Sequence, residues 1–589
     1  MTNKEAPLKW WKPYVFIIVI GTLLYSQTLF FDFTYLDDNV LILDYQYFMR
    51  NLSNIGQAFK QDVFHVLHVE SHFYRPILTL SFMIDTQLGS ASPWIFHVTN
   101  IIVHIVSSCL VFLLLVKLKY TKDLSFFVSL IFTVHPLLSQ AVGWIPGRND
   151  SLLGIFILTS FIFFIDFAEG KKTRYFLGHL PFFIFALFTK ETAVALPLIC
   201  ILYVRLILNR RTLSVTNIWV MIGWLIVLGF WFLIRRYTLG GGGGLSPFEL
   251  SQSLLQALPG LIQQIGKILL PFNLSVMPTI RDTNIIYGIL TIFILAIVFY
   301  KSKSKRITYA IFGFSWFIFF LFPTYAVRIS SAENYFQLEH RLYIPMIGFF
   351  IGLIETDIVK KLNFRNKRTL IICGSIILIL SIATFHYSKR FKDTFSFWKD
   401  AATNSPHSSA AQKGLGNAYF RAGKYGNAEG QYIKAIELNP NEQMVHNNLG
   451  LIYMYKNLLK EAEEEFRKEM VVNPEFDKVC YNLGLVYSKQ NRIQEARAIW
   501  EKALSLNPEN FDASNNLAHI YYQEGKTKEA KEMWENILHV NPDYVYAYKN
   551  LVMYYYDQKD FPKAIYYVKE LRKRGVEIPL EILKKLNMD

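Results

Sequence analysis

The sequence predicts an all-α protein in which a polytopic membrane domain is followed by a solenoid of helical repeats. Long apolar stretches recur through the first 390 residues, and prolines then recur every 34 residues toward the C-terminus. The distribution of charge predicts how the membrane domain is oriented in the bilayer. The chain has 589 residues and is 52% hydrophobic but only 18% charged, which excludes a disordered chain and an ordinary soluble enzyme.

We expect about eleven transmembrane helices within residues 1–390. Eleven apolar stretches approach the length that a helix needs to cross a bilayer, and the fifth and sixth are the least clearly separated. They lie near residues 13–31, 94–116, 124–142, 151–168, 175–189, 192–208, 217–234, 284–300, 307–325, 343–358 and 369–387.

The net charge of +15 belongs to this membrane domain. Residues 391–589 carry 27 basic and 27 acidic side chains, so the excess lies entirely before them. By parity of the spans, six short segments share one side of the membrane, with 21 basic against 5 acidic residues. Positively charged loops stay in the cytoplasm, so an odd number of spans places the C-terminal part outside. The charge therefore indicates topology and does not indicate nucleic acid as a partner. The six segments are the N-terminus, 117–123, 169–175, 205–211, 301–306 and 355–368.

The C-terminal part shows a strict 34-residue period. Residues 408–577 match about five tetratricopeptide (TPR) repeats, preceded by a linker or first helix at 391–407 and followed by a capping helix at 578–589. Such a superhelix offers a concave groove that commonly binds an extended peptide or a partner helix, although it can also be a scaffold or dimerisation arm. The repeated positions include Pro406, Pro440, Pro474, Pro508 and Pro542, with Gly416, Gly450 and Gly484 expected at close helix contacts.

Polar and ionisable side chains gather at the predicted outer ends of the spans, where they mark function more often than surface charges do. Asp37 and Asp38 directly follow the first span, and Arg75 precedes a proline and the apolar segment 77–84 in the long first outer loop. In the second span, His97, Asn100 and His104 are three and four residues apart, so their side chains lie on one helical face. The remaining outer candidates lie in four further segments. Together these candidates are His97, Asn100, His104, His135, Arg148, Lys190, Glu191, His340 and Arg341.

Carboxylates beside Arg, Lys and His suit the attack of a hydroxyl on an anomeric carbon whose leaving group is a phosphate. A carboxylate can take the proton of the hydroxyl, while basic groups neutralise the charge on the departing phosphate. A lipid-phosphate donor would also explain a membrane location. The chain has neither a Walker loop nor a Rossmann glycine pattern, so a nucleotide substrate is not supported.

Taken in order, these motifs resemble the transmembrane and TPR-containing O-mannosyltransferases of the polytopic GT-C superfamily, relatives of the protein O-mannosyltransferases. The resemblance implies inverting transfer of a sugar, expected to be mannose, from a polyprenyl-phosphate donor to Ser or Thr of a protein. It implies that the acidic pair supplies the catalytic base, with the roles of Asp37 and Asp38 left open. No cofactor is expected to be required, although the paired acids could hold a divalent metal. The motifs are the outer Asp37-Asp38, Tyr74-Arg75-Pro76, His97-x-x-Asn100-x-x-x-His104, His135-Pro136, Gly147-Arg148, Lys190-Glu191 and His340-Arg341-Leu342-Tyr343-Ile344-Pro345.

The other candidate residues are expected to bind the donor phosphate or sugar. This expectation comes from their charge and from the side of the membrane on which they are predicted to lie. The array of about five repeats is shorter than in animal members of the family, so the resemblance does not imply which acceptor this protein uses. Two alternatives stay open: a glycan or lipid acceptor, and a non-enzymatic membrane scaffold or transporter. We expect a bacterial plasma membrane with periplasmic repeats, and otherwise an endoplasmic reticulum membrane with lumenal repeats.

Overall fold

The computed structural model describes residues 11–64, 73–210, 215–240, 246–303, 306–325, 337–586 and 588. It divides into two compact units, residues 1–411 and residues 412–589. Every regular element among the described residues is helical, which confirms the all-α prediction.

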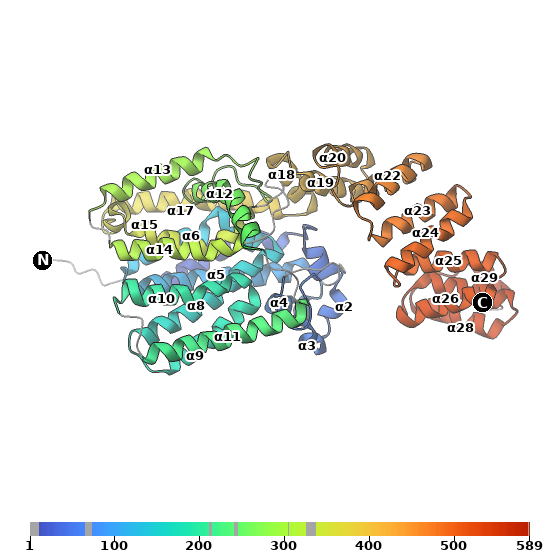
Figure 1. Cartoon of the computed structure of the whole chain (residues 1–589), viewed down its shortest axis with the longest axis horizontal. Coiled ribbons are helices and arrows are strands. Elements are labelled where there is room, and N and C mark those ends of the chain that lie inside the picture. Colours follow the sequence, from blue (N-terminus) through green and yellow to red (C-terminus); the bar gives the residue numbers. More distant parts are fainter. Residues whose placement is uncertain are drawn as a thin grey trace. The chain divides into compact units, whose positions relative to one another are not determined.

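The first unit is a bundle whose long helices run side by side (Figure 1). A helix occupies each of the eleven predicted apolar stretches. Among the described residues, six helices are long and apolar enough to cross a membrane, or seven if one bent pair counts as a span; two further apolar helices, α9 and α13, are shorter. The number of crossings therefore stays a prediction. The helices are α1 (Lys12–Tyr25), α5 (Pro93–Lys117), α6 (Lys122–Val134), α8 (Arg148–Ala168), α9 (Arg174–Thr189), α10 (Leu196–Leu202), α11 (Val215–Leu239), α13 (Ile286–Lys301), α14 (Ile307–Leu321), α15 (Tyr343–Ile354) and α17 (Lys367–Ser388).

Four of the six predicted cytoplasmic segments contact one another at one end of this bundle, and a fifth contacts the residue that precedes one of them. Glu355 accepts hydrogen bonds from Arg306 at 2.6 Å, Lys360 at 2.8 Å and the Tyr120 hydroxyl at 2.9 Å. Lys119 pairs with Glu169 at 3.1 Å. An Arg210 side chain also donates to the carbonyl of Ala168 at 2.7 Å, next to Glu169. The parity argument from the charges thus grouped segments that the fold brings together.

Short helices cover the opposite end of the bundle. The long first outer loop forms α2 (Gln46–Met49), α3 (Ile55–Ala58) and α4 (Pro76–Gly89), which lie at one end of the unit (Figure 1). They bury an apolar cluster that includes Phe33, Leu41 and Phe82. The segment 77–84, expected as a piece of apolar chain in this loop, is therefore part of a packed helix.

Two helices at this end lie outside the apolar stretches from which the spans were predicted. The amphipathic helix α12 (Pro247–Leu269) starts with a capping box, in which Ser246 and Glu249 exchange side chain–backbone hydrogen bonds. The helix α18 (Thr394–Asn404) belongs to the first unit: its Trp398 Nε1 donates to the carbonyl of Thr34 at 3.1 Å. The segment expected as a linker or first helix thus packs against the loop that carries the two acids.

The second unit consists of five helix pairs and a short final helix that follow the 34-residue period. The glycines expected at helix contacts have no room for a side chain: a Cβ would lie 2.5 Å from Tyr432 at Gly416, 2.8 Å from Phe466 at Gly450 and 2.2 Å from Trp500 at Gly484. The helices are α19 (Ser409–Arg421), α20 (Tyr425–Leu438), α21 (Val445–Tyr455), α22 (Leu459–Val472), α23 (Asp477–Lys489), α24 (Ile493–Leu506), α25 (Phe511–Gln523), α26 (Thr527–Val540), α27 (Val545–Asp557), α28 (Phe561–Lys573) and α29 (Leu580–Lys585).

Candidate active site

Asp38 organises the loop that follows the first span. Its carboxylate is fully buried and accepts hydrogen bonds from the backbone N–H of Thr34 at 2.6 Å, the hydroxyl of Thr34 at 3.1 Å and the backbone N–H of Leu36 at 3.1 Å. These bonds close a tight turn in which Tyr35 has a φ of 57°, an unfavourable conformation for a side chain of this size. Burial raises the pKa of Asp38 to about 6, and the three hydrogen bonds oppose this rise.

Asp37 lies beside it but is held differently. Its side chain is partly exposed and forms no hydrogen bond or ion pair with any described residue. Burial raises the pKa of Asp37 to about 7; the negative charge of Asp38 adds to this rise, and the positive charge of Arg75 opposes it. Of the two acids, Asp37 is therefore the one that is available to accept a proton near neutral pH.

Arg75 reaches this region from the start of α4. Pro76 occupies the first turn of that helix, and the preceding Arg75 has a non-helical backbone that turns its side chain toward η7 (Glu191–Ala195). Its guanidinium forms an ion pair with Glu191 at 2.9 Å and lies over the ring of Phe73. Burial alone would raise the pKa of Glu191, but Arg75 and Lys190 outweigh it and hold the value at about 2. Glu191 is thus a fixed anion that orients Arg75.

A second ion pair lies next to the first. Lys190 ends α9 in an extended conformation, and its Nζ lies 2.7 Å from both carboxylate oxygens of Asp150 in the first turn of α8. His340 Nε2 is 3.6 Å from the same carboxylate, and the charge of Arg341 also acts on it. Burial lowers the pKa of His340 well below its usual range, and the charges of Lys190, Arg341 and Arg75 add to this effect. His340 is therefore neutral.

These contacts and charge interactions define what we call the outer cluster, a group of four acids, three cations and one neutral imidazole from five segments of the chain. It contains Asp37, Asp38, Arg75, Asp150, Lys190, Glu191, His340 and Arg341.

Arg148 and Asn100, expected to bind the donor, are both buried between helices. Arg148 is completely buried, and its guanidinium donates to the side-chain oxygen of Asn100 at 2.6 Å and to the carbonyl of Phe96 at 2.7 Å. It also pairs with Asp85 at 2.5 Å. The Asn100 amide N–H groups face backbone carbonyls of the 142–145 segment. Both side chains connect α4 and α8 to α5, and the expected contacts of these two residues with the donor stay a prediction.

The three intramembrane histidines also connect helices. His104 lies between the Tyr343 hydroxyl at 2.8 Å and the carbonyl of Thr133 at 3.0 Å. His135 Nε2 donates to the carbonyl of Ile268 at 3.0 Å, because its Nδ1 accepts the backbone N–H of residue 137. His97 is fully buried and packs edge-on against Phe31. Hydrogen bonds hold the rings of His104 and His135 inside the bundle, whereas neither ring nitrogen of His97 has a hydrogen-bond partner among the described residues. The expected contacts of these three residues with the donor stay a prediction.

Asp150 is the member of the outer cluster that the sequence prediction missed. It follows Arg148 in the same outer segment, and an acid at the start of an apolar span is a signal that could have found it. Trp144, whose ring lies 5.4 Å from that of His340, was missed too, because nothing distinguishes it from a core aromatic residue. Among the described residues, no three His, Cys, Asp or Glu side chains gather in a group that could hold a metal ion.

Comparisons with known proteins support both parts of the prediction. A tetratricopeptide repeat model matches residues 487–552 and a TPR repeat model matches residues 416–457, which confirms the predicted repeats. A protein O-mannosyl-transferase of Caenorhabditis elegans is 26% identical over 391 residues, covering 62% of this chain and 54% of that protein. TMTC3 of Homo sapiens, also named a protein O-mannosyl-transferase, is 29% identical over 209 residues, covering 34% and 22%. The chain thus spans about half the length of the first relative and less than a quarter of the second.

Solved structures similar to this chain include PilF of Pseudomonas aeruginosa, with a TM-score of 0.29 and 23% identity over 31% of this chain and 85% of that one. YrrB, a TPR protein, has a TM-score of 0.25 and 22% identity over 32% and 90%. The chain is thus similar in sequence to proteins named as O-mannosyl-transferases and carries TPR repeats, while these structural likenesses carry no functional information.

Proposed function

We propose that the protein is an inverting membrane glycosyltransferase that moves mannose from a polyprenyl-phosphate donor to Ser or Thr hydroxyls of proteins on the outer face. The observation that carries this proposal is the Asp37 carboxylate, which has a pKa of about 7 and no hydrogen bond or ion pair with a described residue, beside the paired cations Arg75 and Lys190. The similarity to proteins named as O-mannosyl-transferases supports the choice of sugar and acceptor.

In this reaction Asp37 would accept the proton of the attacking hydroxyl. The hydroxyl oxygen forms a bond to the anomeric carbon as the bond from that carbon to the phosphate oxygen breaks, which inverts the configuration. Both electrons of the broken bond leave with the polyprenyl phosphate. Arg75, Lys190 and Arg341 would neutralise the charge that develops there, and Glu191 and Asp150 would keep two of these cations in place.

Asp38 has a supporting part in the same proposal. Its carboxylate is occupied by Thr34 and Leu36, so it shapes the turn that presents Asp37 and raises the pKa of its neighbour through its charge. We therefore propose a division of labour that the sequence left open, in which Asp37 would be the base and Asp38 would hold the loop. The proposal routes no step through a metal ion.

The TPR unit would present protein acceptors or a partner protein, because such superhelices commonly bind extended peptides in their concave groove. We place this unit outside a bacterial plasma membrane, with the lumen of the endoplasmic reticulum as the alternative compartment.

The test is a transfer assay with the purified full chain in detergent. Polyprenyl-phosphate-mannose is incubated with a panel of Ser- and Thr-containing proteins, and with glycans and lipids as competing acceptors, for the wild type and Asp37→Asn. We expect mannose on Ser or Thr with the wild type and a loss of about 10²–10⁴-fold in the variant. Transfer only to a glycan or lipid would overturn the proposed acceptor, and undiminished transfer by Asp37→Asn would overturn the proposed base.

A further inference from the structure

We propose that Glu339 is a positioning residue for the proposed transfer, acting through the turn that presents His340 and Arg341 to the outer cluster. The inference rests on the proposed function. It starts from a buried ion pair that the reaction itself does not use.

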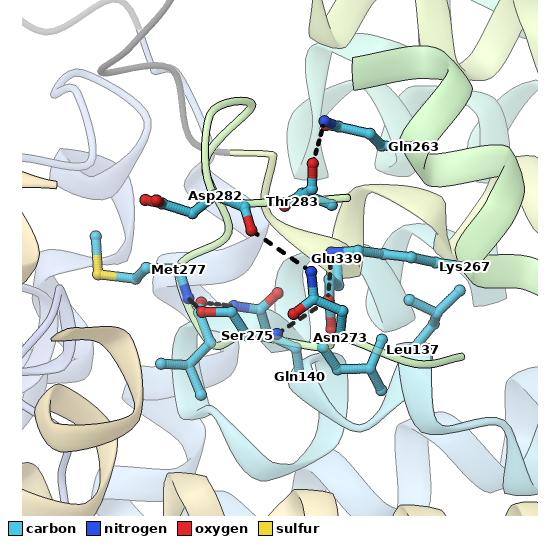
Figure 2. A network of polar contacts seen from close by, with 12 residues as sticks. Leu137, Gln140, Gln263, Lys267, Asn273, Ser275, Met277, Asp282, Thr283 and Glu339 are labelled. Carbon is cyan, nitrogen blue, oxygen red and sulfur yellow. Dashed lines mark hydrogen bonds and ion pairs between the residues drawn. The ribbon is translucent and has the colours of Figure 1, made fainter. Parts of the chain in front are cut away.

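The carboxylate of Glu339 is the centre of a buried polar network (Figure 2). One oxygen accepts the Lys267 Nζ of α12 at 2.9 Å and the backbone N–H of Ser275 at 3.4 Å. The other accepts the Tyr387 hydroxyl of α17 at 2.7 Å. The end of α12, the segment just after it and α17 therefore converge on one side chain that is only 1% exposed.

The same turn is held on its other side by Gln140. The turn is η11 (Glu339–Leu342), and the backbone N–H of His340 donates to Gln140 Oε1 at 3.1 Å. Gln140 Nε2 in turn donates to the carbonyl of Val276 at 3.0 Å, next to Ser275. The 275–276 segment thus holds the turn twice, through Glu339 directly and through Gln140.

The segment that holds the turn is itself fixed by α18. Asp400 accepts the backbone N–H of Val276 at 3.1 Å and pairs with Arg390 at 2.9 Å. Arg390 also donates to the carbonyl of Leu274 at 2.7 Å. The anchor of Glu339 is therefore a braced piece of backbone rather than a mobile loop end.

The turn also contributes two members of the outer cluster, His340 and Arg341. The ring of His340 packs on Trp144, and its Nε2 lies 3.6 Å from Asp150. The charge of Arg341 acts on the same carboxylate. A four-residue 3-10 turn has poor hydrogen-bond geometry and little stability of its own. Its orientation must come from its anchors, and Glu339 is the anchor with the most partners.

A buried ion pair is a weak source of stability, because removing two charges from water offsets most of their attraction. The pair of Lys267 and Glu339 is better explained by the geometry that it imposes. A displacement of about 1 Å in a group that binds substrate can cost about 100-fold in rate.

The chain offers a matched control for the test. Glu355, at the opposite end of the bundle, is also a buried carboxylate that accepts hydrogen bonds from a tyrosine, a lysine and a third donor. We would compare Glu339→Gln and Glu355→Gln in the transfer assay with polyprenyl-phosphate-mannose. Glu339→Gln is expected to lower kcat/KM for the donor about 10- to 100-fold, through a higher donor KM, with the acceptor KM unchanged. Glu355→Gln is expected to change neither constant more than about twofold.

Two further variants separate positioning from folding. Lys267→Met/Glu339→Leu replaces the pair by apolar groups and is expected to fold but to stay slow, whereas Glu339→Asp, which keeps the charge, is expected to recover part of the donor affinity. Equal donor kinetics for the Glu339 and Glu355 variants, or full activity of the apolar double variant, would overturn the inference.

Hydrogen–deuterium exchange provides a readout that does not depend on catalysis. Peptides covering residues 337–345 are expected to exchange faster in Glu339→Gln than in the wild type, and at the wild-type rate in Glu355→Gln. Wild-type exchange in the Glu339 variant would overturn the anchoring role. A wild-type protein that transfers no mannose would defeat the proposed function, while the exchange data would still decide whether Glu339 anchors the turn.

Discussion

Glu355 and Asp37 are acids at opposite ends of the membrane domain, and they are held in opposite ways. Glu355 is surrounded by Tyr120, Arg306 and Lys360, which all donate to its carboxylate. Asp37 has no hydrogen-bond or ion-pair partner among the described residues, although Arg75 is close enough to act on its charge. The carboxylate of Glu355 accepts several hydrogen bonds and so holds loops together. The carboxylate of Asp37 accepts none from the described residues and so can take a proton from a substrate. Both ends of the domain carry clustered charges, and the number of hydrogen-bond and ion-pair partners of each acid distinguishes the two ends better than the charges do.

The largest effect should come from a substitution of Asp37. Asp37→Asn is expected to reduce mannose transfer about 10²–10⁴-fold without lowering thermal stability, because the Asp37 side chain forms no hydrogen bond or ion pair with any described residue. Asp38→Ala should instead lower the melting temperature, since it leaves two buried backbone N–H groups without their acceptor, at about 1–3 kcal/mol each. Initial rates and thermal melts of both variants check this. Equal behaviour of the two variants would mean that the acids act as one unit.

Two lysines that each pair with a buried acid sharpen the comparison between the ends. Lys190→Met removes a cation of the outer cluster and is expected to lower kcat/KM about 100-fold, as does the loss of one donor to a developing anion. Lys360→Met removes a cation beside Glu355 and should change kcat/KM by no more than about twofold. Donor kinetics of the two variants are the measurement. A large loss in the Lys360 variant would break the distinction between the ends.

The pH dependence of the reaction tests the state of Asp37. The carboxylate must be deprotonated to act as a base, so kcat/KM should rise with pH through a midpoint near its pKa of about 7. The negative charge of Asp38 contributes to this raised pKa, so Asp38→Asn should move the midpoint to lower pH. Rate profiles between about pH 5 and 9 measure both midpoints. A midpoint unchanged in the Asp38 variant would indicate that another group titrates.

The smallest effect on transfer should come from the repeats, if the chemistry is confined to the outer end of the membrane domain. Gly484→Ala would place a Cβ 2.2 Å from Trp500 and is expected to destabilise its repeat by about 1–3 kcal/mol. Gly430→Ala, in the exposed middle of α20 with open space around it, should stabilise by about 0.5–1 kcal/mol. Thermal melts check the opposite signs, and transfer to a short peptide acceptor should stay unchanged in both variants.

Much of the fold follows from patterns that are local in the sequence. The repeat period, the apolar stretches and the side of each loop depend on residues close to one another along the chain, so they could be predicted before any packing was known. For the same reason, the outer side could be predicted for Asp37, Arg75, Lys190 and His340. The amphipathic helix α12 was not predicted, because polar residues interrupt its apolar residues along the chain and leave no continuous apolar stretch.

What each polar group does at that outer end was decided by tertiary structure. Helical spacing placed Asn100 and His104 on one face of α5, but only packing determined that this face meets Arg148 and Tyr343. Arg75 and Glu191 are 116 residues apart, and their pairing depends on how α4 is docked in the bundle. The sequence by itself determined the fold class and the side of the membrane domain that carries the candidate groups. Tertiary structure decided which of those groups are consumed as partners of one another and which are left for chemistry, because hydrogen bonds and ion pairs depend on distances of a few ångströms between segments that are remote in the chain.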